Sequence, residues 1–474
     1  MSNRKSAIRE LSNNLAKERD AWILRNAFFY DSDTAYMRFL IPEGLRVLDL
    51  GCGTGRLLAS LRPSHGVGVD FSPNMIEVAR GLNPELEFQI GDVEDAQFMA
   101  SLAGPFDVII LSDTIGSLED CQTALSNLHH LCVPNTRLVV SYYSRMWDPI
   151  LVIARYLRLQ MPQVRQNILS TEDIENLLYL SDFQTIKREW RQLLPRRLGG
   201  LGTLVNRYIA PFPVIRRLCL RNYLVARPAR ELVRPGQSAT VLIPCRNERG
   251  NIEAAVRRIP RFCDDLELLF VEGHSRDDTL AEINRVIDAY PHLDIKVTVQ
   301  DGKGKGDAVR KGFMLARGDI LMILDADLTT PPEALPKFYD AIVMGRGEFI
   351  NGSRLVYPME KDAMRFLNTL ANTAFSWLFS WLLNQRFTDT LCGTKVLTQS
   401  HYRQIASNRT YFGEFDPFGD FDLIFGAAKM NLKIVEIPIT YASRTYGETQ
   451  ISRFAHGWLL LKMVVFAFRK LKAF

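Results

Sequence analysis

Short runs of apolar residues alternate along the chain with longer stretches whose apolar residues recur every three or four positions. In the first half, the short runs are residues 46–50, 66–70, 86–90, 106–111 and 137–142. In the second half, they are residues 240–244, 266–271, 295–299, 320–324, 349–351 and 434–438. Strands that alternate with amphipathic helices are typical of a parallel sheet covered by helices. Because this series occurs twice, we predict an α/β protein with two tandem domains.

The segment between the two series, residues 195–236, is rich in Pro, Gly and Arg. Nine arginines and one glutamate lie between Arg196 and Arg234, so the net charge of +5 is concentrated there. Interleaved aromatic and aliphatic residues suit a segment that lies on an anionic lipid surface, and a basic linker helix packed against an acidic domain is the alternative. We predict a first domain at 1–194, a basic amphipathic connector at 195–236 and a second domain at 237–474. No nucleic-acid-binding module accompanies the arginines, so nucleic acid is not an expected partner.

The seven cysteines are scattered singly, without a C-x-x-C pair, as in proteins of reducing compartments. The first twenty residues are too polar for a secretory signal. No stretch approaches the roughly 20 apolar residues that a membrane-spanning helix needs. We therefore expect a cytoplasmic protein.

The first candidate site is the glycine-rich loop VLDLGCGTG, Val47 to Gly55. Glycines after a strand let the backbone turn sharply and approach a ligand closely. Asp70 closes the next strand, where a carboxylate can accept hydrogen bonds from ribose hydroxyls. Arg56 stands where a dinucleotide fingerprint has its third glycine, which disfavours a pyrophosphate ligand.

Together with GDVEDAQ and FDVIILSDTIGSLED further along, this region, about residues 40–190, resembles the class I (Rossmann-like) S-adenosylmethionine-dependent methyltransferases. The resemblance implies that Asp49 and the glycine loop hold the methionine part, that Asp70 holds the ribose, and that Asp92 and Val93 lie at the adenine edge. The loop glycines concerned are Gly51, Gly53 and Gly55.

The methyl acceptor is not fixed by any motif, because methyl transfer needs mainly in-line positioning. The absence of an Asn-Pro-Pro-Tyr type signature after the fourth strand favours a hydroxyl or carboxyl acceptor. Tyr142, Tyr143 and Arg145 are either acceptor-pocket residues or ordinary rim residues. A domain that binds the cofactor without catalysis, as a sensor or scaffold, is the alternative.

The second candidate site is Asp325-Ala326-Asp327, at the end of a strongly apolar strand. Two carboxylates one residue apart at a strand end can both face one hard cation, which would bridge a diphosphate. A D-x-D triplet alone is common in loops. Here it follows a buried strand and two candidate nucleotide loops, VLIPCRNERGNI and GKGKGDAVRKG.

Residues 238–455 are similar to glycosyltransferase family 2, most closely to its dolichyl-phosphate mannosyltransferase and polyprenyl-phosphate sugar synthase branch. This similarity implies a GT-A (nucleotide-diphospho-sugar transferase) fold and inverting transfer. The implied substrate-binding residues are Pro244, Arg246, Glu248, Val271, Glu272, Lys305, Asp325, Ala326, Asp327, Arg354, Arg365, Asp389 and Arg444. Asp325 and Asp327 are the implied metal ligands and, with Arg354 and Arg444, the implied catalytic residues. Gly273 and Thr449-Gln450 depart from the Asp and Ser-Lys that the family often has.

The chemistry of the acceptor separates two possibilities. A lipid phosphate is already largely ionised at neutral pH and needs only cations to position it, whereas a hydroxyl acceptor needs a general base. Arg354, Arg365 and Arg444 could supply the cations, and Asp420 or Asp422 could serve as the base. The helical stretches 366–383 and 456–474, rich in Trp and Phe, suit a membrane interface, with a core helix or the seam of a homo-oligomer as the alternatives.

These residues lead us to expect a bifunctional transferase bound peripherally to the cytoplasmic face of a membrane. Its second domain would use Mg²⁺ or Mn²⁺ to move a sugar from GDP-mannose or a UDP-sugar to polyprenyl or dolichyl phosphate. Its first domain would use S-adenosylmethionine to methylate a related glycan, lipid or small metabolite. The alternative is a glycosyltransferase with a hydroxyl acceptor and a non-catalytic first domain.

Overall fold

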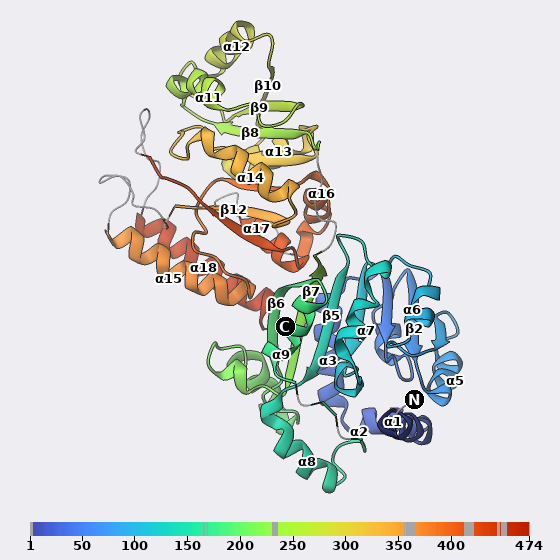
Figure 1. Ribbon diagram of the computed structural model, residues 1–474. Coiled ribbons are helices and arrows are strands. Elements are labelled where there is room, and N and C mark those ends of the chain that lie inside the picture. Colours follow the sequence, from blue (N-terminus) through green and yellow to red (C-terminus); the bar gives the residue numbers. More distant parts are fainter. Residues whose placement is uncertain are drawn as a thin grey trace. The chain divides into compact units, whose positions relative to one another are not determined.

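The computed structural model describes residues 3–473, apart from residues 165, 168, 230–235, 355, 357–365, 412–420, 443–445 and 447–452. The described chain divides into two compact units, with the boundary close to residue 231 (Figure 1). Each unit is built around a seven-stranded, mostly parallel sheet. The prediction of two α/β domains in tandem is confirmed.

The first sheet has the strand order β3-β2-β1-β4-β5-β7-β6. Its strands are β1 (Arg46–Leu50), β2 (His65–Asp70), β3 (Glu87–Ile90), β4 (Val108–Ser112), β5 (Arg137–Tyr143), β6 (Phe183–Arg191) and β7 (Arg221–Pro228). Strands β3, β2, β1, β4 and β5 are parallel, and β7 runs antiparallel to both β5 and β6. The Rossmann-like prediction for this domain is confirmed.

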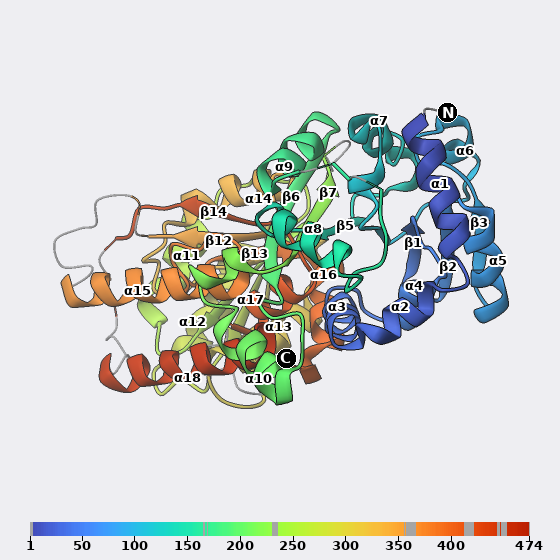
Figure 2. The ribbon, with the colours of Figure 1, turned by 90° about the horizontal axis from the view of Figure 1, so that it is seen from below.

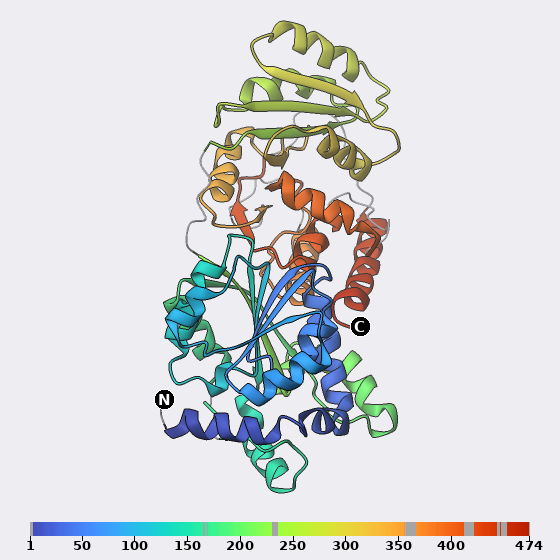
Figure 3. The ribbon, with the colours of Figure 1, turned by 90° about the vertical axis from the view of Figure 1, so that its right-hand side faces the viewer.

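Helices cover both faces of the first sheet (Figure 3). One face packs on α3 (Ala27–Leu40), α4 (Arg56–Ser60) and α5 (Pro73–Leu82), and the other packs on α6 (Ala96–Ser101), α7 (Cys121–Ser126) and α9 (Thr171–Leu180). The remaining helices are α1 (Asn3–Leu15), α2 (Arg19–Arg25), α8 (Asp148–Tyr156) and α10 (Leu201–Leu204). Helix α1 lies along α5, where Asn13 accepts a hydrogen bond from Ser72 (Figure 2).

The second sheet has the order β10-β9-β8-β11-β13-β12-β14, in which only β13 is antiparallel to its neighbours. Its strands are β8 (Ala239–Cys245), β9 (Leu266–Glu272), β10 (Asp294–Val299), β11 (Ile320–Ile323), β12 (Phe349–Ser353), β13 (Lys395–Thr398) and β14 (Ile434–Pro438). Its helices are α11 (Ile252–Arg258), α12 (Thr279–Ala289), α13 (Lys305–Leu315), α14 (Leu335–Val343), α15 (Phe366–Leu383), α16 (Gln399–Ser407), α17 (Phe421–Lys429) and α18 (Arg453–Leu471).

The core on one face of the second sheet contains side chains of α11, α12 and α14. Helix α13 covers the other face, where Gly312 approaches Leu242 and Val271 so closely that a Cβ atom would lie 2.2 Å from Leu242. Helices α15 and α18 lie side by side, and Phe379 of α15 packs on Phe421 and Phe425 of α17 (Figure 1). No helix in the described part of the chain is long and apolar enough to cross a bilayer.

The predicted connector is wrong for residues 221–228, which form strand β7 and are buried along its whole length. Arg221 is buried because Asp33 and Asp113 neutralise its charge, with 2.8 Å between Arg221 Nε and Asp33 Oδ1. Arg227 is buried because Gln184 accepts two of its hydrogen bonds. These partners lie far away in the sequence, so the sequence around each arginine does not show that the side chain is buried.

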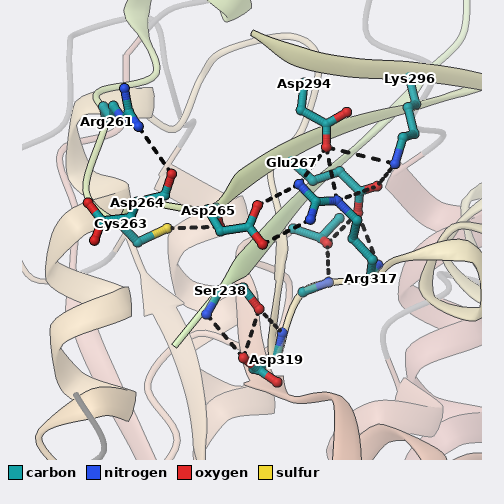
Figure 4. A network of polar contacts seen from close by, with 12 residues as sticks. Ser238, Arg261, Cys263, Asp264, Asp265, Glu267, Asp294, Lys296, Arg317 and Asp319 are labelled. Atoms are coloured by element: carbon teal, nitrogen blue, oxygen red, sulfur yellow. Dashed lines mark hydrogen bonds and ion pairs between the residues drawn. The ribbon is translucent and has the colours of Figure 1, made fainter. Parts of the chain in front are cut away.

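The amino ends of β8, β9 and β10 are joined by a polar network centred on Arg317, which binds Asp265 and Asp294 (Figure 4). Glu267, which is buried, accepts hydrogen bonds from Lys296 at 2.7 Å and from Thr240 at 2.6 Å. Arg317 itself is 43% exposed. The network therefore ties three strands together at the partly solvated edge opposite their carboxyl ends.

The two arginine centres should differ in their effect on stability. Removing Arg221 leaves the buried carboxylate of Asp33 and the half-buried carboxylate of Asp113 without their cation, so Arg221→Met should lower the free energy of unfolding by about 3–5 kcal/mol. Water screens Arg317, so Arg317→Met should cost less than about 1 kcal/mol. Scanning calorimetry of the full chain measures both effects. Equal shifts of the two variants would contradict the assignment of Arg221 to the core.

Candidate active sites

The glycine loop after β1 passes close to side chains that leave no room for a Cβ atom. Gly51 and Gly53 have φ values of 81° and 55°, in the left-handed region that favours glycine. A Cβ atom on Gly53 would lie 2.7 Å from Nε of Arg19, and one on Gly51 would lie 2.2 Å from Oγ1 of Thr114. The loop therefore presents bare backbone to the cavity beside it.

Asp70 and Asp49 lie at the carboxyl ends of neighbouring strands beneath this loop. The carboxylate of Asp70 accepts hydrogen bonds from the backbone N–H groups of Gly53 and Ser72, at 3.0 and 2.9 Å. Burial raises the pKa of Asp70, and these hydrogen bonds oppose the rise. Asp70 lines the cavity, and its carboxylate helps to fix the shape of the loop.

Asp49 is 1% exposed, and its Oδ1 atom has no hydrogen-bond partner among the described residues. Burial, followed by the charge of Asp70, raises the pKa of Asp49 to about 7, while Arg19 opposes the rise. Asp49 is not among the residues that line the cavity, and it lies at the base of the loop. A buried carboxyl oxygen without a partner marks a place where a ligand can complete a hydrogen bond.

Asp92 and Val93, after β3, line the same cavity of about 180 Å³, which we call the cofactor cavity after its predicted ligand. Lys5 of α1 forms ion pairs with Asp92 and Glu94, the latter at 2.7 Å. The cavity thus brings together Gly51, Gly53, Asp70, Asp92 and Val93 of the predicted cofactor residues. Gly55 and Asp49 lie outside its lining.

The first 30 residues, which carry no recognisable motif, contribute unpredicted residues to this site. Lys5, Arg19 and Tyr30 line the cofactor cavity, and Thr54 donates a hydrogen bond to Asp20 at 2.9 Å. Asp113, directly after β4, is a further unpredicted residue, with a left-handed φ of 60° and an ion pair with Arg221. A non-glycine residue held in that region is backbone strain of the kind that gathers at functional sites.

Two further cavities adjoin the cofactor cavity. The second, of about 270 Å³, shares Asp113 and Tyr143 with it and is also lined by Tyr142, Arg145 and Arg155. The third, of about 180 Å³, shares Tyr30 and Tyr143 with it and is lined mainly by apolar side chains. The second cavity is therefore lined by all three candidate acceptor residues, Tyr142, Tyr143 and Arg145.

In the second domain, a cavity of about 300 Å³ lies at the carboxyl ends of β8, β9 and β11. Its lining contains eight of the predicted residues, namely Pro244, Arg246, Glu248, Val271, Lys305, Asp325, Ala326 and Asp327. Gly273 and Gln300 also line it. A Cβ atom on Gly273 would lie 3.2 Å from Arg246 Cβ, so an Asp at this position would crowd Arg246.

The carboxylate of Asp325 has close neighbours on two sides. Lys305 Nζ lies 2.7 Å from Asp325 Oδ1. Burial opposes ionisation, but Lys305, followed by Lys395 and Arg354, outweighs it and lowers the pKa of Asp325. On its other side, a Cβ atom on Gly393 would lie 1.8 Å from Asp325 Oδ2, so only glycine fits there. Asp325 is therefore held in one place as a carboxylate.

Asp327 Oδ1 accepts hydrogen bonds from the backbone N–H and the hydroxyl of Thr329, at 3.1 and 2.8 Å. Among the described residues, no group of three His, Cys, Asp or Glu side chains is placed to hold a metal ion. Magnesium-type sites often use one or two carboxylates and complete their shell with substrate phosphates and water. Asp325 and Asp327 fit a cation of that kind.

Arg354 and Asp389 were predicted as separate substrate residues, and the structure joins them in an ion pair. Arg354 Nε and Nη2 lie 2.6 and 2.8 Å from the two carboxylate oxygens of Asp389, which is 1% exposed. This pair lowers the pKa of Asp389, although burial alone would raise it. Neither residue lines the cavity, and Asp389 fixes the orientation of the Arg354 guanidinium.

Glu272 also lies outside the lining. Its carboxylate accepts hydrogen bonds from the backbone N–H groups of His274 and Ser275, at 3.1 and 2.6 Å, and so fixes the turn after β9. Arg365, Arg444 and Asp420 lie outside the described residues. Asp422 is paired with Arg409 at 3.2 Å.

Three non-glycine residues with left-handed φ values follow the strands that form this cavity. Asn247, His274 and Leu328 have φ values of 57°, 56° and 53°. They come directly after β8, β9 and the Asp325-Ala326-Asp327 turn. Strain repeated at the same end of neighbouring strands is consistent with a functional edge of the sheet.

Comparison with known proteins gives two family matches. Residues 24–188 match the family described as a methyltransferase domain. Residues 240–408 match the family described as Glycosyl transferase family 2. The two matches fall in the two structural units and together include both glycine-rich and aspartate-rich sites.

The second domain is similar to Dolichol-phosphate mannosyltransferase of Pyrococcus furiosus, with 30% identity over 217 residues, which are 45% of this chain and 58% of that protein. It is similar to Dolichyl-phosphate hexose transferase of Haloferax volcanii, with 30% identity over 222 residues, which are 46% of this chain and 89% of that protein. The chain thus spans little more than half the length of the Pyrococcus relative.

A crystal structure of a SAM-dependent methyltransferase from Thermotoga maritima is also similar to this chain. It has 19% sequence identity and a TM-score of 0.37, and the match covers 47% of this chain and 100% of that one. The family matches and the relatives agree that the protein is a transferase. The chain joins a methyltransferase domain to a glycosyltransferase domain, and it belongs to glycosyltransferase family 2 through its second half.

Proposed function

We propose that the second domain transfers a sugar, with inversion, from a nucleotide-sugar to a polyprenyl-phosphate type lipid, and that the first domain methylates a related glycan, lipid or small metabolite. The observation that carries the first half is the placement of Asp325 and Asp327 with Lys305 in one cavity at the carboxyl end of β11. Ligands of open α/β sheets bind at this end of the strands. The relatives' names, which specify dolichyl phosphate as acceptor, support the lipid half.

In this proposal Asp325 and Asp327 hold a divalent cation, which would neutralise charge on the donor's diphosphate. Lys305, which lies 2.7 Å from Asp325, would be available to contact a phosphate oxygen if that carboxylate held the cation. The Arg354 guanidinium, oriented by Asp389, lies outside the lining but close enough to help lower the pKa of Asp325, so it would add positive charge behind the site. Pro244, Arg246 and Val271 would contact the nucleoside at the other end of the cavity.

A phosphate acceptor fits the surroundings better than a hydroxyl acceptor. In inverting transfer, an acceptor oxygen attacks the anomeric carbon as the nucleoside diphosphate leaves with the bonding electrons. An ionised phosphate oxygen has no proton to lose, so no base is needed. Of the two candidate bases, Asp422 is already paired with Arg409 and does not line the cavity.

The first domain fits S-adenosylmethionine, which supplies an electrophilic methyl group. The buried Oδ1 of Asp49 can accept a hydrogen bond from the ligand's ammonium group, and the bare backbone at Gly51 and Gly53 lets the ligand approach. Asp70 would accept from the ribose, and Asp92 with Val93 would border the adenine. Tyr143 and Asp113 lie between the cofactor cavity and the second cavity, where an acceptor would be oriented.

We also propose that the protein binds peripherally to the cytoplasmic face of a membrane. In α15 and α18, Trp377 and Trp458 are 62% and 61% exposed, as interfacial aromatics would be. The basic end of α18 contributes less than its sequence predicts, because Lys472 is buried and donates a hydrogen bond to Asn384 at 2.8 Å. None of these contacts supports a homo-oligomer.

The metal-site proposal predicts that Asp325→Asn and Asp327→Asn each lower the rate of sugar transfer by roughly a hundredfold or more, because the cation loses a charged ligand. The assay follows radiolabelled sugar from GDP-mannose and a panel of UDP-sugars into polyprenyl phosphate. Chelation with EDTA should abolish transfer, and added Mn²⁺ should restore it in the wild type only. Asp340→Asn, on the surface of α14, is the control.

Undiminished transfer by either aspartate variant, or full activity in EDTA, would remove the cation from the proposal. Offering polyprenol beside polyprenyl phosphate tests the acceptor in the same assay. Sugar on the polyprenol alone would favour the hydroxyl alternative.

Asp49 should make cofactor affinity depend on pH. Its pKa of about 7 means that the carboxyl is largely protonated below that pH, whereas a bound ammonium group requires the carboxylate. The affinity for S-adenosylmethionine should therefore weaken by up to about tenfold per pH unit below about pH 7 and level off above it. Asp49→Asn should bind weakly at every pH. Exposed Asp31, changed to Asn, is the control.

Isothermal titration calorimetry between about pH 5.5 and about pH 8.5 measures this dependence. A wild-type affinity that does not change across this range, or an Asp49→Asn variant that binds like the wild type, would disprove the role of Asp49.

A further inference from the structure

Helix α8 has no buried residue of its own, although it is rich in apolar residues. Ile150, Ile153 and Tyr156 are 52%, 59% and 88% exposed. A helix that leaves its apolar side chains in water lacks the packing that normally stabilises helices in proteins. Its apolar side therefore calls for a partner.

A second exposed apolar segment adjoins α8. Residues 198–218 expose a series of large side chains, namely Leu198, Leu201, Leu204, Tyr208, Ile209, Phe212, Val214 and Leu218. Trp147, just before α8, donates a hydrogen bond to the carbonyl of Leu218 at 2.8 Å. The third cavity is lined by Trp147, Ile150 and Leu151 on one side and by Pro195 and Arg196 on the other. The two segments, residues 145–159 and 196–218, form one surface, which we call the α8 face.

The α8 face is strongly basic. Its two segments contain eight arginines, of which six are exposed, namely Arg145, Arg158, Arg196, Arg197, Arg207 and Arg217. Arg155 pairs with Asp148 at 3.9 Å, and Arg216 lies over the ring of Trp190. Asp148 is their only acidic residue. Arginine with exposed aromatic and aliphatic side chains is the composition of surfaces that insert shallowly into anionic membranes, where the charge contacts head groups and the apolar atoms enter the acyl boundary.

We propose that the α8 face docks on the surface of an anionic lipid bilayer. A second copy of the chain is a poor occupant, because a two-fold interface would set the arginines of one copy against those of the other. A bilayer satisfies both the positive charge and the apolar side chains. This surface is separate from the exposed tryptophans of α15 and α18, so it gives the methyltransferase domain a membrane contact of its own.

Docking in this way would bring the bilayer to the two cavities beside the cofactor cavity. Arg145, Leu151 and Arg155 belong to the α8 face and also line the second cavity. Trp147 and Ile150 line the third, apolar cavity. Both cavities reach the cofactor cavity at Tyr143. The methyl acceptor is therefore a lipid-borne molecule with an anionic group for the arginines, an inference that rests on the proposed methyltransferase function of this domain.

The test is binding of the full chain to lipid vesicles of phosphatidylcholine, with or without about 30 mol% phosphatidylglycerol, measured by co-sedimentation. All proteins carry Trp377→Ser and Trp458→Ser, so that α15 and α18 contribute little. In this background, Ile153→Asp with Leu157→Asp should weaken binding to the anionic vesicles by on the order of tenfold or more. Both side chains are exposed and line none of the cavities, so the fold and the sites stay intact.

Leu82→Asp is the matched control, because Leu82 is 56% exposed at the end of α5, outside the α8 face, and should leave vesicle binding unchanged. The proposal is overturned if the Ile153/Leu157 variant binds anionic vesicles like the background protein, or if neutral vesicles bind equally well. Dissociation of a dimer by the same variant would identify a second copy as the occupant and would overturn it too.

Assays on the same variant separate this proposal from the proposed function. Binding of S-adenosylmethionine and sugar transfer in detergent should both equal those of the background protein. Loss of vesicle binding with both retained supports the docking surface. The protein could instead bind vesicles through the α8 face but bind no S-adenosylmethionine. That result would support the docking surface and refute the methyltransferase proposal.

Discussion

The second domain depends on one charge balance, that of the Asp325 carboxylate at the end of a buried strand. Burial alone would favour the neutral acid, and Lys305, with Lys395 and Arg354 behind it, keeps the group ionised. A Cβ atom at position 393 would overlap the opposite oxygen, so only Gly393 leaves room for the carboxylate. Much of the surrounding architecture serves this arrangement, because antiparallel β13 carries Lys395 and the Arg354–Asp389 pair fixes the neighbouring cation.

The first domain uses the same edge of its sheet with the opposite electrostatics. Asp49 is buried without a cation close enough to keep its pKa low, and its Oδ1 atom has no hydrogen-bond partner among the described residues. Arg221 of β7 joins Asp33 of α3 to Asp113, which follows β4 and lines the cavity. In each domain the candidate site lies at the carboxyl ends of the strands. At the amino ends of the strands of the second domain, an ion network around Arg317 links neighbouring strands (Figure 4).

Much of this could be predicted from the sequence, because apolar runs and loops after strands are local signals. Eleven of the strands fall where the apolar runs predict them, and the glycine loop and the D-x-D turn lie at cavities. Strands β6, β7 and β13 lie outside these runs. In β7 and β13, the charged residues Arg221, Arg227 and Lys395 are buried by partners distant in sequence or by backbone carbonyls. The pairing of Arg354 with Asp389, and the roles of Lys5 and Arg19, are likewise tertiary contacts without a local pattern.

The most direct test of the central claim is anomalous diffraction from crystals soaked with Mn²⁺ and a nucleoside diphosphate. The account predicts a manganese peak coordinated by an oxygen of Asp325 or Asp327, with the diphosphate bound to the same ion and Lys305 turned toward a phosphate. A nucleotide bound in this cavity without a metal at either carboxylate, or bound elsewhere in the domain, would contradict it.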